Sequence, residues 1–165
     1  MGLEHLRTGF TFDDVLIVPR RSSIRSRQDV SVRTRLSRRV ELDLPVVAAN
    51  MDTVCEHEMA IAMAGLGGIG IVHRFMPTDT QADEIYRVKE AGDGLVVGAA
   101  VGTDRDMVER AKALVAAGAD VLVLDIAHGH SDHAIDGVRT LKDHFADIDV
   151  LAGQLAHPQG AGEPR

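Results

Sequence analysis

Tryptophan is absent from this chain, and its 165 residues contain one tyrosine, four phenylalanines and one cysteine. With so few aromatic rings the core must be aliphatic, which suits strands buried on both faces better than a β-sandwich. The lone Cys55 excludes an intramolecular disulfide and fits a reducing cytoplasm, where we expect the protein to reside. The first ten residues carry charges where a secretory signal needs an apolar stretch, and the run 60–72 is too short and glycine-rich to span a bilayer.

The chain also has no excess of positive charge. The formal net charge is −7, and lysine occurs only at positions 89, 112 and 142. This balance argues against nucleic acid or an anionic membrane surface as a partner. The shares of hydrophobic and charged residues, 45% and 26%, are ordinary for a soluble globular protein, and the length favours a single core.

What the chain does have is a repeating unit from Pro45 onward: an apolar run, a polar loop, an amphipathic stretch and a turn. The apolar runs predict strands at 45–51, 69–75, 95–101, 121–127 and 148–156. Their spacing leaves room for one crossover helix each, which is typical of parallel strands. An open doubly wound sheet and a closed barrel both use such units. Near-constant unit length favours a parallel (β/α)8 TIM barrel, of which this chain would hold about the first five strands and four helices.

The stretches between the strands have helical periodicity. The expected apolar faces are Met59, Met63 and Leu66 in the first helix, Ile85, Val88 and Ala91 in the second (78–91), Met107, Ala111, Leu114 and Val115 in the third, and Ala134, Val138, Leu141 and Phe145 in the fourth. Within the sheet, we expect Val47, Ala49, Ile71, Val97, Ala99 and Val123 to face the inside of the barrel.

Residues 1–44 differ in kind from the repeated units. The stretch 11–19 reads as one extended segment and 29–36 alternates like a strand, so we expect an N-terminal extended or hairpin segment beside the barrel. The predicted organisation is therefore 1–44, then five β/α units over 45–156, then an atypical tail at 157–165. The arginine-rich stretch 20–39 is expected to be solvated or to contact another subunit.

Barrel enzymes carry their chemistry where strands end and βα loops begin. Polar residues lie at each such position: 50–53, 73–74, 102–104, 125–129 and Gln154. Asp52, Thr53, Asp104 and Ser131 read equally well as helix caps. Asp125 is harder to dismiss, because it ends a buried strand, where an unpaired carboxylate is costly.

Three other patterns are not read as sites. The string GLGGIG at 65–70 has the spacing of a dinucleotide fingerprint, but it closes a helix and opens a strand, which is the wrong order. His128, His130 and His133 lack carboxylate or cysteine partners at ligand spacing, so we expect no metal, although a metal-dependent barrel enzyme is an alternative. Cys55 has no base indicated beside it and reads as a small residue in the first turn of a helix.

At these same residues the sequence resembles the IMP dehydrogenase/GMP reductase family. The matching strings are TFDDVLIVP (11–19), PVVAANMDTV (45–54), AIAMAGLGGIGIVHR (60–74), VGAAVG (97–102), VLVLDIAHGHS (121–131) and DVLAG (149–153). The resemblance implies a (β/α)8 barrel that forms homotetramers. It also implies hydride transfer between a purine nucleotide, GMP or IMP, and NAD or NADP, through a covalent adduct on a cysteine.

The same resemblance assigns residues to roles. Met51 would contact the purine base, with Ala49, Asn50 and position 154 lining the nucleotide pocket; the family has Asn where this chain has Gln154. Asp125 would bind the nicotinamide ribose, and Ala127, His128 and His73 would lie on the cofactor side. The family's nucleophilic cysteine belongs to a later glycine-rich loop, so no catalytic residue is expected among these 165. Cys55 does not match that motif.

Two features indicate which member the chain resembles. IMP dehydrogenases usually carry paired CBS modules after the second helix, whereas here 88–94 leads directly into the next strand. The AANMDT form and the string RRSSIRSR (20–27) resemble GMP reductases. We therefore expect a GMP reductase-like protein converting GMP to IMP and ammonia with NADPH, inactive as these 165 residues alone. The alternatives are a CBS-free IMP dehydrogenase, which oxidises IMP to XMP with NAD, and a non-catalytic fragment.

Overall fold

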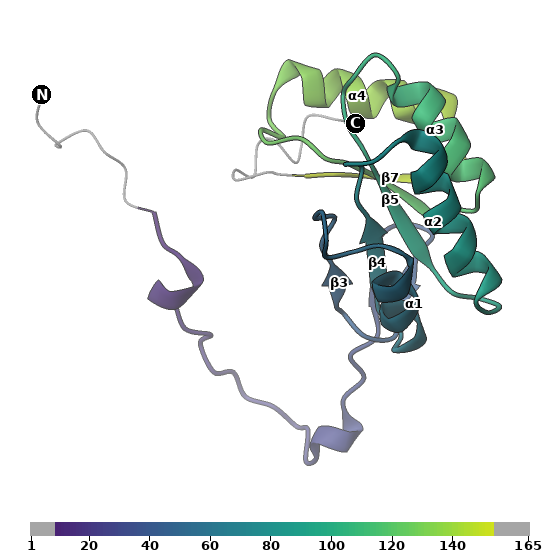
Figure 1. Ribbon diagram of the computed structural model, residues 1–165. Coiled ribbons are helices and arrows are strands. Elements are labelled where there is room, and N and C mark those ends of the chain that lie inside the picture. The colour runs from purple at the N-terminus through teal and green to yellow at the C-terminus, as the bar shows by residue number, and fades with distance from the viewer. Residues whose placement is uncertain (1–8, 154–165) are drawn as a thin grey trace, which may run out of the picture. The chain divides into compact units, whose positions relative to one another are not determined.

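The computed structural model describes residues 9–153 and divides the chain into two compact units, Met1–Ser31 and Val32–Arg165 (Figure 1). In the first unit, the stretch expected to be extended contains a 3₁₀ turn, η2 (Phe12–Asp14). The Asp14 carboxylate accepts hydrogen bonds from the Thr11 N–H at 2.8 Å and the Thr11 hydroxyl at 2.9 Å, which closes the turn. A second turn, η3 (Arg27–Asp29), begins after Ser26. No helix in residues 9–153 has the length and apolarity to cross a membrane.

The second unit begins with a hairpin. Strand β1 (Thr34–Arg35) pairs antiparallel with β2 (Glu41–Leu42), Arg35 opposite Glu41. The N–H groups of Leu36 and Ser37 donate to the Val40 carbonyl and tighten the turn between the strands. The alternating stretch 29–36 thus contributes a strand only at its end, and that strand pairs with residues 41–42.

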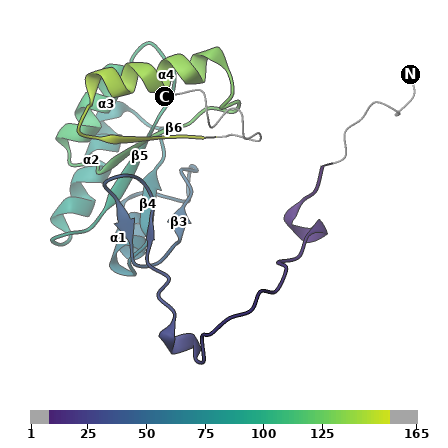
Figure 2. The ribbon, with the colours of Figure 1, turned by 180° about the vertical axis from the view of Figure 1, so that it is seen from behind.

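The repeated units fold as expected. Strands β3 (Val47–Ala48), β4 (Ile69–Val72), β5 (Val97–Val101), β6 (Val121–Leu124) and β7 (Asp149–Ala152) form a parallel sheet in chain order. Helices α1 (His57–Gly65), α2 (Thr78–Glu90), α3 (Met107–Ala116) and α4 (Asp132–His144) join them. Both ribbon views place these helices along one side of the sheet (Figures 1 and 2). Consecutive parallel strands with every crossover on one side form an arc of a (β/α)8 barrel.

Strand register decides which side chains face the helices. Val97, Ala99 and Val101 pack with the buried helix residues, whereas Ile69, Ile71, Ala100 and Val121 form a separate cluster on the other face. The prediction that Val97 and Ala99 face the barrel interior was therefore wrong. In a strand whose residues are all apolar, alternation carries no signal for the face, because both faces are buried.

Three helices bury the predicted faces and one does not. Ile85, Val88, Met107, Ala111, Leu114, Ala134, Val138 and Leu141 are buried, while Ala91 lies just beyond α2 and is exposed. In α1 the expected face was wrong: Met59 is 42% exposed and Leu66 69% exposed. This helix instead packs through Ala60, and a Cβ on Gly70 of β4 would lie 2.6 Å from the Ala60 Cα. Such close approach leaves no room for a large side chain between helix and sheet.

Ion pairs fasten the loops at the amino ends of the strands. Asp149, the first residue of β7, accepts from the Arg39 N–H at 2.7 Å and from Arg39 Nη1 at 2.9 Å. Asp120, just before β6, pairs with Lys89 Nζ at 2.7 Å, and the same nitrogen donates to the Leu95 carbonyl. Burial alone would raise the pKa of Asp149, but hydrogen bonds from Ser37 and Arg39 and the Arg39 charge lower it.

Candidate functional site

Polar residues gather at the opposite, carboxyl ends of the strands. His73 and Arg74 follow β4, Gly102 follows β5, and Asp125 follows β6. The Asp125 N–H donates to the Val101 carbonyl at 2.8 Å and so continues the sheet ladder by one residue. Because parallel strands end at the same edge, this arrangement forms one polar rim, as the sequence predicted.

Arg74 links three strand ends within this rim. Its Nε lies 3.1 Å from Asp125 Oδ2, and its Nη1 lies 3.6 Å from Asp104 Oδ2. Its guanidinium carbon lies 5.1 Å from the centre of the Phe75 ring, within the range of a cation–π contact. The Asp125 side chain is only 17% exposed, so the arginine offsets the cost of burying that carboxylate.

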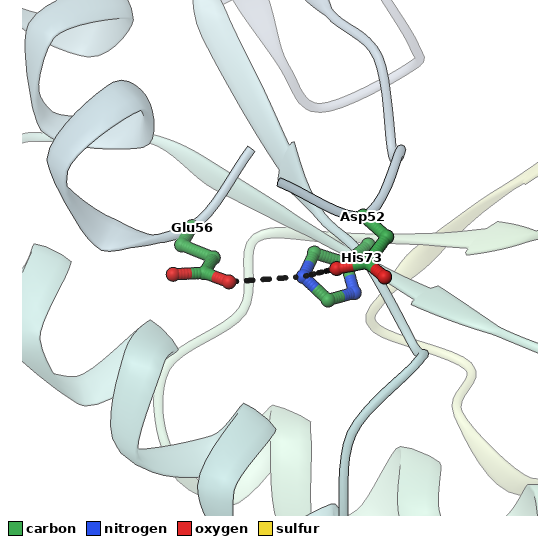
Figure 3. Close-up of side chains that lie close together, drawn as sticks. All are labelled: Asp52, Glu56 and His73. Carbon is green, nitrogen blue, oxygen red and sulfur yellow. Dashed lines mark hydrogen bonds and ion pairs between the residues drawn. The ribbon is translucent and has the colours of Figure 1, made fainter. Parts of the chain in front are cut away.

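His73 faces two carboxylates on the loop before α1 (Figure 3). Its Nε2 lies 3.2 Å from Glu56 Oε1 and 3.7 Å from Asp52 Oδ1. The backbone N–H of Phe75 donates to His73 Nδ1 at 3.2 Å. Because Nδ1 accepts a hydrogen bond, the neutral ring carries its proton on Nε2 and donates it toward the carboxylates. His73 therefore ties the loop after β3 to the end of β4.

The spacing of this cluster also resembles that of a metal site, since the three ligand atoms lie within 4.8 Å of one another. A metal on Nε2 would require the proton to sit on Nδ1. That proton would then face the Phe75 N–H, so two donors would oppose each other at 3.2 Å. The hydrogen bonding favours a structural link over a metal centre.

The loop after β3 presents the residues expected to bind the nucleotide. Met51 is 59% exposed, Ala49 is exposed and Asn50 is partly buried. The N–H groups of Val54 and Cys55 both donate to the Met51 carbonyl, which curls the loop tightly. Thr53 has a φ of 61°, a left-handed conformation unusual for a β-branched residue. Such strain often marks functional loops.

Cys55 belongs to this loop, and its side chain is fully buried. Its Sγ would be 2.9 Å from a Cβ on Gly70. Burial raises the pKa of the thiol to about 11, against a smaller lowering by a hydrogen bond with the Ile71 backbone. A protonated, inaccessible thiol is a poor nucleophile. The expected place of Cys55 in the first turn of a helix was wrong, because α1 begins at His57, after the N-cap Glu56.

The remaining candidate site residues lie on the loop after β6, at the start of α4 and at the end of β4. Ala127 and His128 are exposed on the loop after β6. Ser131 caps α4, its hydroxyl accepting from the Ala134 N–H at 3.3 Å, so the capping interpretation holds there. His73, expected on the cofactor side, is 1% exposed, so its ring is not presented at the surface of the rim. Gln154 lies outside the described residues.

Several polar residues that support the rim were missed in the sequence. Glu84 on α2 accepts from both the backbone N–H and Nδ1 of His57, each at 2.7 Å, and so caps the start of α1. The buried Gln81 donates to the carbonyls of Val72 and Ala100 and accepts from Arg110. These partners are far apart along the chain, so no local pattern indicates them.

Comparison with known proteins gives a family match over nearly the whole chain. The model of the IMP dehydrogenase / GMP reductase domain matches residues 9–163. Inosine-5'-monophosphate dehydrogenase of Cryptosporidium parvum is 36% identical, with 99% of this chain and 50% of that protein covered. The enzyme of the same name from Nitrosopumilus maritimus is 30% identical over 94% of this chain and 58% of its own length. GMP reductase of Leishmania donovani is 50% identical over 58% of this chain and 19% of its length.

The chain spans about half the length of the first two relatives. The alignment with the Nitrosopumilus protein runs over 277 residues, although this chain has 165, so that relative carries extra residues inside the aligned region. In this chain α2 ends at Glu90 and β5 begins at Val97, with a short turn between them.

Proposed function

The chain belongs to the IMP dehydrogenase/GMP reductase family, and we propose that it supplies the nucleotide-facing half-barrel of a purine-nucleotide oxidoreductase. Asp125 carries this proposal: a carboxylate on a strand end, partly open at the rim, suits the hydroxyls of the nicotinamide ribose of NAD or NADP. Ala127 and His128 would flank the cofactor. Ala49, Asn50 and Met51 would face GMP or IMP from the neighbouring loop, together with Gln154.

We propose GMP reductase activity first, with NADPH reducing GMP to IMP and ammonia. The Asn50-containing AANMDT string and the short α2–β5 connection support it. Identity over the matching part of the chain does not separate the two activities, because it is 50% with a GMP reductase and 50% with an IMP dehydrogenase. IMP dehydrogenase activity is the second candidate, because the relatives aligned over more than nine-tenths of the chain bear that name. Assembly of several copies, a tetramer in the family, belongs to the same proposal.

Direct binding tests this role for Asp125. Asp125→Ala should weaken binding of the nicotinamide nucleotide by about 2 kcal/mol, roughly thirtyfold, since a hydrogen bond to a charged acceptor is lost. Isothermal titration of the full chain measures the change. Asp136→Ala, an exposed aspartate on α4, is the matched control and should bind normally. Equal affinity of the Asp125 and Asp136 variants would remove the assignment.

Turnover tests the complementary proposal that these 165 residues hold no catalytic nucleophile. With GMP and NADPH, or with IMP and NAD, we expect no change in reduced cofactor, because the thiol of Cys55 is buried and protonated. Alkylation of Cys55 at pH 8 should be about 100-fold slower than that of an ordinary thiol, as its raised pKa implies. Rapid alkylation, or turnover lost in Cys55→Ser, would contradict this.

A further inference from the structure

We propose that Arg74 is a positioning residue, which holds Asp125 so that its carboxylate accepts hydrogen bonds from the vicinal diol of a ribose. This inference rests on the proposed function and deepens it. The bond from Arg74 Nε uses Asp125 Oδ2 at 3.1 Å and does not involve Oδ1. The carboxylate is thereby fixed at one oxygen while the other keeps its capacity to accept.

The charge around Arg74 selects the kind of group that binds here. One guanidinium faces two carboxylates, those of Asp104 and Asp125, which leaves a net negative charge. Next along the chain, His73 faces the further carboxylates of Asp52 and Glu56. A phosphate would be repelled at this rim, whereas neutral hydroxyl donors gain charge-assisted hydrogen bonds. The diol of the nicotinamide ribose fits this requirement, and the cofactor phosphates do not.

The guanidinium is held from several sides. Asp125 and Asp104 engage different nitrogens of the same group, and the Phe75 ring lies near its face. Gly102 leaves the necessary space, since a Cβ there would lie 2.7 Å from Asp104 Oδ2 and 3.1 Å from Arg74 Nη1. The planar guanidinium of an arginine binds two carboxylates in fixed directions, whereas the single ammonium group of a lysine does not.

The experiment uses the full chain with reduced nicotinamide riboside, which carries the ribose diol without a phosphate or a ring charge, and its 2'-deoxy analogue as probes. Isothermal titration should show that the wild type prefers the riboside. Arg74→Met should weaken riboside binding about tenfold and remove most of that preference, as expected when one well-placed hydrogen bond is lost. Gly102→Ala should also weaken riboside binding, although it retains every charge. Arg74→Lys should restore little of the binding lost in Arg74→Met.

A double variant separates positioning from direct contact. If Arg74 acts through Asp125, then adding Arg74→Met to Asp125→Asn should weaken riboside binding no further. Arg87→Met is the control, because Arg87 forms an exposed ion pair with Asp83 on α2. Thermal melts identify variants that fail to fold. If Arg74→Met fails to fold, riboside binding by Gly102→Ala tests the positioning role instead.

The outcomes are distinct. Unchanged binding and preference in both Arg74→Met and Gly102→Ala would overturn the positioning role and leave the proposed function standing. Additive losses in the double variant would show that Arg74 contacts the ligand itself, which also overturns it. A wild-type chain that binds neither probe would overturn the proposed function, and the positioning role with it.

Discussion

The amino ends and the carboxyl ends of the strands carry the same types of charged residue, but these residues are bound differently. At the amino ends, Asp149 and Asp120 are bound by an arginine and a lysine, and backbone groups share those contacts. At the carboxyl ends, Asp104 is 72% exposed and Asp125 shares a single arginine with it. Asp149 is bound at both carboxylate oxygens, and Asp120 by a lysine and a backbone N–H, so among the described residues the amino-end carboxylates have more protein partners than those at the carboxyl ends.

Hydrophobic packing follows the same division. The hairpin places Val40 and Leu42, 5% and 2% exposed, in one cluster with Ile69 and Val121 at the starts of β4 and β6. Beside the carboxyl ends, Met51 and Phe75 are each 59% exposed. The buried hairpin contact agrees with the general division in β/α barrels, in which the amino ends of the strands serve stability and the carboxyl ends serve binding.

The largest effect that tests this comparison is loss of the hairpin's hydrophobic contact. Leu42→Ala should lower the free energy of unfolding by about 2–5 kcal/mol, because it removes buried methyl groups and leaves a cavity. Chemical denaturation measures this. Leu66→Ala makes the same substitution at a side chain that is 69% exposed and should cost far less. Equal losses in the two variants would show that the hairpin does not stabilise the sheet.

An intermediate effect is expected from the tether between the hairpin turn and β7. Asp149→Asn should lower stability by about 1–3 kcal/mol at neutral pH, because charge-assisted hydrogen bonds from Arg39 are weakened. Asp147→Asn is the control, since that side chain is fully exposed and 3.7 Å from Arg39.

The same tether predicts a pH dependence. Since the folded-state pKa of Asp149 is lowered, its contribution is complete above the unfolded value of about 3.9 and is lost as pH falls through the folded-state pKa. Asp149→Asn should flatten the decline in stability at acidic pH. A wild-type profile and a variant profile that stay parallel below pH 4 would contradict the tether.

The sequence was sufficient for the succession of elements, because period and turn chemistry are local. It predicted a helix at 78–91 and strands starting at 69 and 121, where the structure has α2 and the strands β4 and β6. It failed for the faces of Val97 and Met59, since strand register and close packing at Gly70 depend on neighbours in space.

The position of the polar rim could be predicted from the sequence, but the contacts among its side chains could not. Strand ends indicated Asp125 and His73, yet their partners Arg74 and Glu56 lie 51 and 17 residues away in the chain. One feature of the sequence pointed to Arg74 as a rim residue, namely its place directly after His73 at a strand end. Glu56 had none, because its role follows from how the loop after β3 folds back to β4.

The smallest effect should come from the exposed member of the rim. Asp104→Ala should change the free energy of unfolding by no more than about 0.5 kcal/mol, because an ion pair of 3.6 Å with one partner 72% exposed is screened by solvent and salt. When the denaturation is repeated at low and at high salt, the difference in unfolding free energy between Asp104→Ala and the wild type should be smaller at high salt. Asp149→Asn, by contrast, removes a charge whose side chain is only 10% exposed and which also accepts a backbone N–H. If the two substitutions cost the same, the carboxyl-end carboxylates are structural like those at the amino end, and the division between a stabilising end and a binding end fails.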